Sequence, residues 1–143
     1  MIGRQLEVIY CDDVRQEIGN KQSFIGVYPG DLIISGSLPV VLPKLCLVST
    51  LILPRSDEVA SARIRIMQGD QCLLESDGLL PPSEEVKSTN PEEVLEEQLL
   101  RIALVVVLSP FQVDEETVLR VVAEVDGAEL VSRPLRIRRA RSD

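Results

Sequence analysis

The sequence predicts a mainly β protein: a two-sheet β-sandwich, immunoglobulin-like or related, with one short helix near residues 91–97. Three observations predict this class. Apolar and polar residues alternate with period two in several segments, and two other runs are apolar at odd and even positions alike. Turn signals recur at about the 8–12-residue spacing that is typical of β-sandwiches. No linker divides the chain, so residues 1–143 are expected to form a single domain.

The first half of the chain is expected to contain six strands, at residues 4–11, 23–28, 32–35, 44–53, 62–67 and 72–75. The segment 44–53 is apolar at both parities, which is typical of a central strand covered on both sides. Residues 12–22 are polar and contain Gly19-Asn20, so we expect a loop there. Residues 40–42 lie between Pro39 and Pro43, which favours an extended crossing segment over a hydrogen-bonded strand.

The second half begins with a predicted loop at residues 77–90. Asn90 suits a helix N-cap and Pro91 the first helical position, so a short helix is predicted over 91–97. Residues 102–108 are apolar at odd and even positions alike, so a second buried, central strand is expected there. Alternating strands are expected at 119–125 and 129–138. Asp126-Gly127 predicts a type I′ hairpin turn, while Pro134 confines the last strand to an edge or a bulge.

Composition excludes several chemistries. The chain has no histidine, so neither Ser-His-Asp nor Cys-His catalysis can be built from it, nor a mixed Cys/His zinc site. Cys11, Cys46 and Cys72 are widely spaced beside apolar runs, which indicates buried, reduced thiols rather than a disulfide framework.

Charge and hydropathy also restrict the location and the partners. No signal peptide is recognised and no apolar run approaches the roughly 20 residues of a membrane span, so we expect a cytoplasmic protein without membrane contact. The net charge is −8 and aromatic residues make up 3% of the chain, which argues against nucleic-acid binding. Five arginines in the last twelve residues favour an edge strand or a contact for an acidic partner.

One stretch carries a family resemblance. The residues Cys11-Asp12-Asp13-Val14-Arg15-Gln16-Glu17-Ile18-Gly19-Asn20-Lys21, continued to Tyr28, resemble the opening of a family of short bacterial and phage proteins known only as a domain of unknown function. Leu42-Pro43-Lys44-Leu45 and Leu108-Ser109-Pro110-Phe111 fit the same family, so the resemblance covers nearly the whole chain. It implies a bacterial or prophage cytoplasmic setting, and it brings no activity, cofactor or catalytic residue.

The polar segment 12–22 is the first candidate site for binding a protein partner, because binding residues commonly lie on loops of a rigid scaffold. Its candidate residues are Asp12, Asp13, Arg15, Gln16, Glu17, Asn20 and Lys21. The alternative is a structural role, in which the two aspartates accept backbone N–H bonds and Arg15 pairs with Glu17 on the surface.

Three further candidates are weaker. Acidic loops, Asp12-Asp13 with Asp57-Glu58 or with Asp114-Glu115-Glu116, could hold calcium, but no spacing matches a calcium loop. Carboxylate pairs could act as acid and base, yet no motif isolates such a pair. The acidic segment 77–97 could dock on a basic partner or be a solvated insertion. We therefore assign no catalytic residue, metal ligand or cofactor.

The sequence favours a non-catalytic, cytoplasmic protein of bacterial or phage origin that acts through protein–protein contacts. It could be a virion or assembly accessory, associated with a virion, or a binder that targets a host protein. Exposed sheet edges could also pair identical chains in a symmetric homodimer. The alternatives are a small carboxylate- or metal-dependent enzyme and a calcium- or ligand-binding module.

Overall fold

The computed structural model describes residues 3–78 and 99–141, which form strands, turns and irregular segments and no helix. The mainly β class predicted from the sequence is confirmed, whereas the helix predicted over 91–97 lies outside the described residues. The strands are β1 (Gln5–Glu17), β2 (Lys21–Val27), β3 (Asp31–Ile34), β4 (Val40–Leu42), β5 (Leu45–Pro54), β6 (Ala62–Gln68), β7 (Gln71–Ser76), β8 (Leu99–Leu108), β9 (Phe111–Val113), β10 (Thr117–Val125), β11 (Ala128–Val131) and β12 (Leu135–Arg139).

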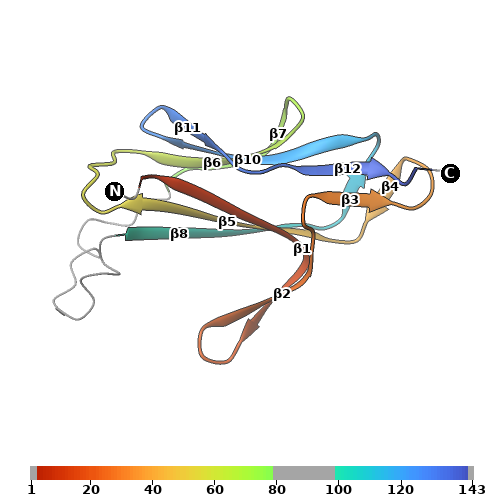
Figure 1. The fold of residues 1–143 in the computed structure, drawn as a ribbon, viewed down its shortest axis with the longest axis horizontal. Helices are drawn as coiled ribbons and strands as arrows, with labels where there is room; N and C mark the ends of the chain where they lie inside the picture. The colour runs from red at the N-terminus through yellow and green to blue at the C-terminus, as the bar shows by residue number, and fades with distance from the viewer. Residues whose placement is uncertain (1–2, 79–98, 142–143) are drawn as a thin grey trace.

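Two sheets lie one above the other (Figure 1). The smaller has the order β2-β1-β5-β8, and the larger has the order β3-β12-β10-β6-β7 with β11 also pairing β10. A two-stranded sheet of β4 and β9 lies beside them. All the pairs are antiparallel except β12 with β3, which are parallel although they lie far apart in the sequence.

The core between the sheets is almost entirely aliphatic. One buried cluster contains Leu47 and Leu51 from β5, Ile64 from β6 and Leu119 from β10, so both sheets contribute to it. Every residue from Leu45 to Leu53 is buried except Thr50, which is half-buried. The prediction of a central strand covered on both sides is therefore confirmed, and burying these side chains is the main force that joins the layers.

The hairpin turn predicted at Asp126-Gly127 is confirmed. Asp126 and Gly127 have φ angles of 49° and 85°, and they join β10 to β11 with Val125 opposite Ala128. Both central residues of a type I′ turn need positive φ, which explains this dipeptide. The Asp126 carboxylate also accepts backbone N–H bonds from Ala60 and Ser61, at 3.0 and 2.8 Å, so the turn holds the segment before β6.

Several predictions about elements were wrong. Residues 102–108, expected to be a buried central strand, lie in β8 at the edge of the smaller sheet, where Val106 is the one buried residue of the strand. Residues 40–42 form a paired strand, β4, because Pro39 and Pro43 flank the pairing residues and remove none of their N–H donors. Residues 12–22 form parts of two strands and their turn rather than a loop. The strand predicted over 129–138 is two strands, β11 and β12, which lie along the same edge of β10.

The break between β11 and β12 falls at Ser132–Pro134, and side chains replace the missing backbone pairing. Ser132 N donates to Val121 O at 2.9 Å, while Val121 N donates to Ser132 Oγ at 2.9 Å. The Tyr10 hydroxyl, from the smaller sheet, crosses the core and donates to Arg133 O at 2.8 Å. The backbone groups Val121 N, Val121 O, Ser132 N and Arg133 O thus have partners despite the break.

The two buried serines should respond to alanine in opposite ways. Ser132→Ala removes the acceptor of Val121 N and should lower the free energy of unfolding by about 1–3 kcal/mol. Ser49 is also buried, but its Oγ has no hydrogen-bond partner in the described structure, so Ser49→Ala should leave stability unchanged or raise it. Denaturant unfolding of both variants tests this, and an equal loss of stability in the two would contradict it.

Tyr10→Phe should lower the free energy of unfolding by about 1–2 kcal/mol, because Arg133 O loses a donor inside the protein. Tyr28→Phe is the matched control, since the Tyr28 hydroxyl donates to an exposed carboxylate. We expect the control to lose less than half as much in the same urea titration. Equal stability of Tyr10→Phe and the unmodified chain would show that the bond across the core contributes nothing.

Candidate functional site

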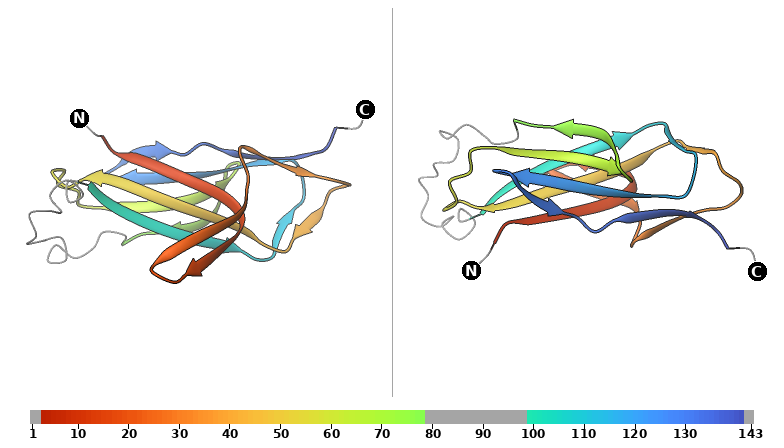
Figure 2. Two further views of the ribbon diagram at one scale, coloured as in Figure 1. Left: turned by 60° about the horizontal axis from the view of Figure 1, so that its bottom comes forward. Right: turned by 90° about the horizontal axis from the view of Figure 1, so that it is seen from above.

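A hairpin arm, residues 12–27, projects from the layered body. The first part of β1, from Gln5 to Cys11, pairs with β5, but the rest of β1 pairs only with β2. The arm therefore leaves the sheet as a two-stranded ribbon, which extends beyond the layers in Figure 1 and in the left view of Figure 2. Gly19 and Asn20 close it with φ angles of 84° and 60°, as their turn signal predicts.

The sequence-predicted site residues all lie on this arm. Asp12, Asp13, Arg15, Gln16 and Glu17 are in β1, Asn20 is in the turn, and Lys21 begins β2. The segment is a pair of strands rather than a loop because Val14 and Phe24 face each other, both half-buried, and pair the two strands. The structure thus brings the seven residues together, but it divides them between the base of the arm and its tip.

Asp12 has a structural role at the base of the arm. Its carboxylate accepts a hydrogen bond from the Tyr28 hydroxyl. Burial of Tyr28 and, to a smaller extent, this hydrogen bond raise the pKa of Tyr28 to about 12. Gly26 lies against the same carboxylate with a φ of 68°, and a Cβ there would be 2.2 Å from Asp12 Oδ2. Only glycine fits this position, so Asp12 and Gly26 together fix the path of β2 as it leaves the sheet.

Asp13 joins the arm to the body. Its Oδ1 lies 2.6 Å from Lys44 Nζ, at the start of β5, and also accepts the backbone N–H of Val14 at 3.0 Å. Arg15 Nε lies 3.8 Å from Asp13 Oδ2. The hydrogen bond from Lys44 lowers the pKa of Asp13 and raises that of Lys44. Asp13 therefore links the arm to the body, and it accepts a backbone bond as the structural alternative predicted. That alternative was wrong about Arg15, which pairs with Asp13 and not with Glu17 in the described structure.

The other five predicted residues are exposed around the tip. Glu17 and Lys21 lie opposite each other where the strands meet the turn, and Arg15, Gln16 and Asn20 lie close to them along the arm. Sequence reasoning missed the apolar residues among them. Ile18 is 94% exposed at the tip, and Ile25 and Val27 are 41% and 49% exposed on β2. The signal for Ile18 was available: a β-branched residue directly before a turn has no core to face.

Two of the three cysteines are buried in the smaller sheet. Cys11 and Cys46 are buried directly opposite each other on β1 and β5, and burial raises the pKa of both thiols, that of Cys11 to about 11. The prediction that Cys72 is also buried was wrong. Cys72 lies on β7, an edge strand of the larger sheet, and its side chain is exposed.

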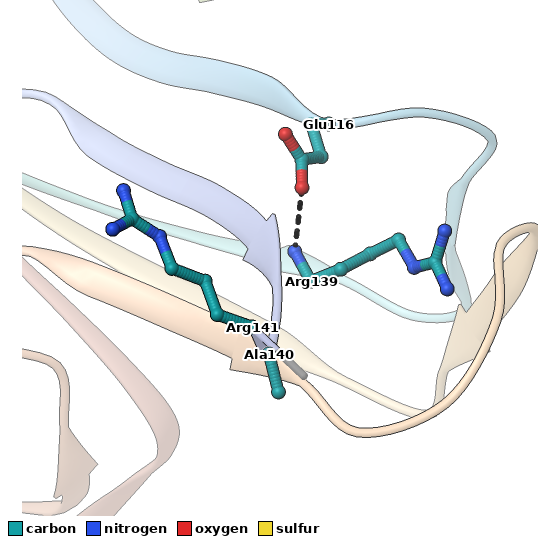
Figure 3. A pocket seen from close by; sticks show the side chains of 4 residues that line it. All are labelled: Glu116, Arg139, Ala140 and Arg141. Carbon is teal, nitrogen blue, oxygen red and sulfur yellow. Dashed lines mark hydrogen bonds between the residues drawn. The ribbon is translucent and has the colours of Figure 1, made fainter. Parts of the chain in front are cut away.

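The other candidate chemistries find no assembled site. The described residues contain no group of three or more metal-ligating side chains, and Asp57 pairs with Arg4 at 3.0 Å. A shallow hollow is lined by Glu116, Arg139, Ala140 and Arg141. There the Glu116 carboxylate accepts the Arg139 backbone N–H at 3.0 Å, while the guanidinium groups of Arg139 and Arg141 point in opposite directions (Figure 3). The hollow therefore does not gather charged groups around a ligand.

Comparison with known families places the chain. A family model described as a family of unknown function, DUF6941, matches residues 7–138. The chain belongs to this family. The resemblance to a domain of unknown function is therefore confirmed. No curated protein and no solved structure matches this DUF6941 member. Within its described residues, no helix is long and apolar enough to cross a membrane.

Thiol labelling should separate the three cysteines. With iodoacetamide at about pH 8, Cys72 should react first, because it is exposed, while Cys11 and Cys46 are buried with raised pKa values and so carry little thiolate. Intact-mass spectrometry should show one label on the native chain and three in denaturant. Labelling of Cys11 or Cys46 as fast as Cys72 would contradict the buried pair.

Proposed function

We propose that this DUF6941 member is a non-catalytic interaction protein that binds a protein partner through the tip of its hairpin arm. In this proposal residues 1–143 form a single domain, a two-sheet β-sandwich of immunoglobulin-like or related type. The observation that carries the proposal is Ile18, which is 94% exposed at the end of a ribbon held away from the body. An isoleucine in that position gains burial only from another molecule.

The surroundings of Ile18 support this proposal. Glu17, Asn20 and Lys21 surround an apolar centre with charged and polar groups, which is the usual arrangement of a protein interface. The arm is also held in place before any partner binds, by the bonds of Asp12 to Tyr28 and of Asp13 to Lys44. A preorganised arm loses less conformational entropy on binding, which favours affinity.

Bulk properties indicate the kind of partner. A net charge of −8 disfavours nucleic acid and anionic membrane surfaces, so the partner in this proposal is a protein. The setting we propose is the cytoplasm of a bacterial cell, with the chain of bacterial or phage origin. Its role there would be that of a virion or assembly accessory or of a binder that acts on a host protein.

Substituting the tip tests this proposal. Tagged wild-type chain, Ile18→Asp and the control Val131→Asp are incubated with bacterial lysate, and retained proteins are quantified by mass spectrometry. Val131 is a matched control because it is exposed and apolar but lies on β11, in the larger sheet. We expect a partner that the wild type and Val131→Asp retain and that Ile18→Asp loses by about tenfold or more.

Equal melting temperatures of the three proteins would show that the substitutions act on binding rather than on folding. The proposal fails if no retained protein depends on Ile18. It also fails if Val131→Asp loses the same proteins as Ile18→Asp, since the loss would then reflect added charge rather than the tip.

A further inference from the structure

The strand β8 forms one edge of the smaller sheet and is ten residues long. It pairs with β5 along all ten residues in one unbroken register, from Leu99 opposite Pro54 to Leu108 opposite Leu45. Within the described residues β8 pairs with no other strand. Its outer side therefore presents alternate backbone N–H and C=O groups over a length of roughly 33 Å.

This edge lacks the features that normally prevent edge-to-edge pairing. Arg101 is the one charged residue of β8, and the strand contains no proline and no bulge. The edge strands β2, β3 and β7 are better protected. β2 begins with Lys21 and contains Gly26, β3 is four residues long, and the pairing of β7 with β6 has a register shift.

Side chains on both faces of β8 are incompletely covered. Ile102 and Leu104 pack against the core yet remain only partly buried, because the core is open beside the last strand of the sheet. On the opposite face Val105 and Val107 are 39% and 50% exposed. A further strand on this edge would cover apolar groups on both faces as well as pair the backbone.

We propose that a second copy of the chain supplies this strand, so that β8 pairs antiparallel with β8 of the second copy about a two-fold axis. Opposite residues of an antiparallel pair point to the same face, so the inward residues of one copy meet the inward residues of the other. The two smaller sheets would then form one continuous sheet of eight strands. This surface is separate from the hairpin arm and does not depend on the function proposed for it.

Repulsion between two copies is small at this edge, because Arg101 is the one charged residue of β8. A chain with a net charge of −8 repels its own copies, but β8 contains no acidic residue. With the axis near Val105, Arg101 of each copy would lie opposite Ser109 of the other. The two arginines would be about 27 Å apart, well beyond the roughly 8 Å over which charges act at physiological salt.

The size of the edge sets the strength of the association. A strip about 33 Å long and about 10 Å deep covers on the order of 300–400 Å² per copy, less than the roughly 800 Å² per partner of a standard stable interface. The pairing should therefore be a reversible equilibrium rather than a permanent dimer. Its dissociation constant is expected in the micromolar range or above.

Sedimentation velocity over about 5–500 µM protein tests the pairing. The mass of the native chain should rise from the 15.8 kDa monomer towards twice that value as concentration increases. Val105→Lys combined with Val107→Lys places four like charges beside the axis and should weaken association at least about tenfold. Ile33→Lys is the matched control, because Ile33 is also an exposed apolar residue on an edge strand, β3, and its association should equal that of the native chain.

Mixing oppositely charged variants adds a positive readout. Val105→Lys and Val105→Glu should each associate poorly alone and better when mixed, since the axis lies near this residue. Circular dichroism tests whether each variant folds. If the variant with Val105→Lys and Val107→Lys does not fold, Ala103→Lys replaces it, because Ala103 is also exposed on β8. Ile18→Asp should associate like the native chain, so the failure of the arm proposal and the failure of this one are distinguishable.

A native chain that stays monomeric at every concentration overturns the proposal, even where a strand of a different protein pairs with β8. So does a Val105→Lys and Val107→Lys variant that associates as tightly as the native chain. Dimerisation that Ile33→Lys weakens and the β8 variant does not would place the contact on β3 instead.

Discussion

The hydrogen bond from the Tyr10 hydroxyl to Arg133 O connects the two layers at the point where the strand along β10 is interrupted. Pro134 cannot donate a backbone hydrogen bond, so the last part of the chain cannot form one uninterrupted strand along β10. Ser132 and Tyr10 supply the partners that the break requires. A polar contact inside an otherwise aliphatic core also fixes the relative position of the two sheets more narrowly than apolar packing does.

The same strand that carries this bond also carries the arm. Tyr10 lies in the part of β1 that pairs with β5, and two residues later Asp12 begins the part that pairs only with β2. Asp12 and Asp13 then determine how the ribbon leaves the body. The position of Ile18 at the tip is therefore set by contacts made in and next to the core.

Elements with a strong local pattern could be predicted from the sequence. The run 44–53 is apolar at both parities and is buried on both faces, and Asp126-Gly127 forms the expected turn. The arm could not be predicted in this way, since a ribbon that is largely exposed on both faces shows no alternation. The pairing of β3 with β12 was equally inaccessible, because no local signal links segments about one hundred residues apart.

Two of the seven candidate residues at 12–22 have partners within the chain that the sequence did not reveal. Polar residues drew attention to 12–22, yet two of them, Asp12 and Asp13, bind other parts of the same chain. Tyr28 and Gly26 lie against Asp12, and Lys44 pairs with Asp13. Only the tertiary structure reveals that these residues are close to the two aspartates. The exposed apolar residues were overlooked because an isoleucine in a sequence reads as core by default.

The place of β12 between β3 and β10 has a consequence for biosynthesis. β3 is among the first strands to leave the ribosome, but its neighbour in the sheet is translated about one hundred residues later. Until Leu135–Arg139 emerges, the nascent chain therefore holds β3 without its lateral partner, and the larger sheet cannot close. The larger sheet can therefore be completed only after β12 has been synthesised, and we expect its folding to be slow, as is typical of a topology with many distant contacts.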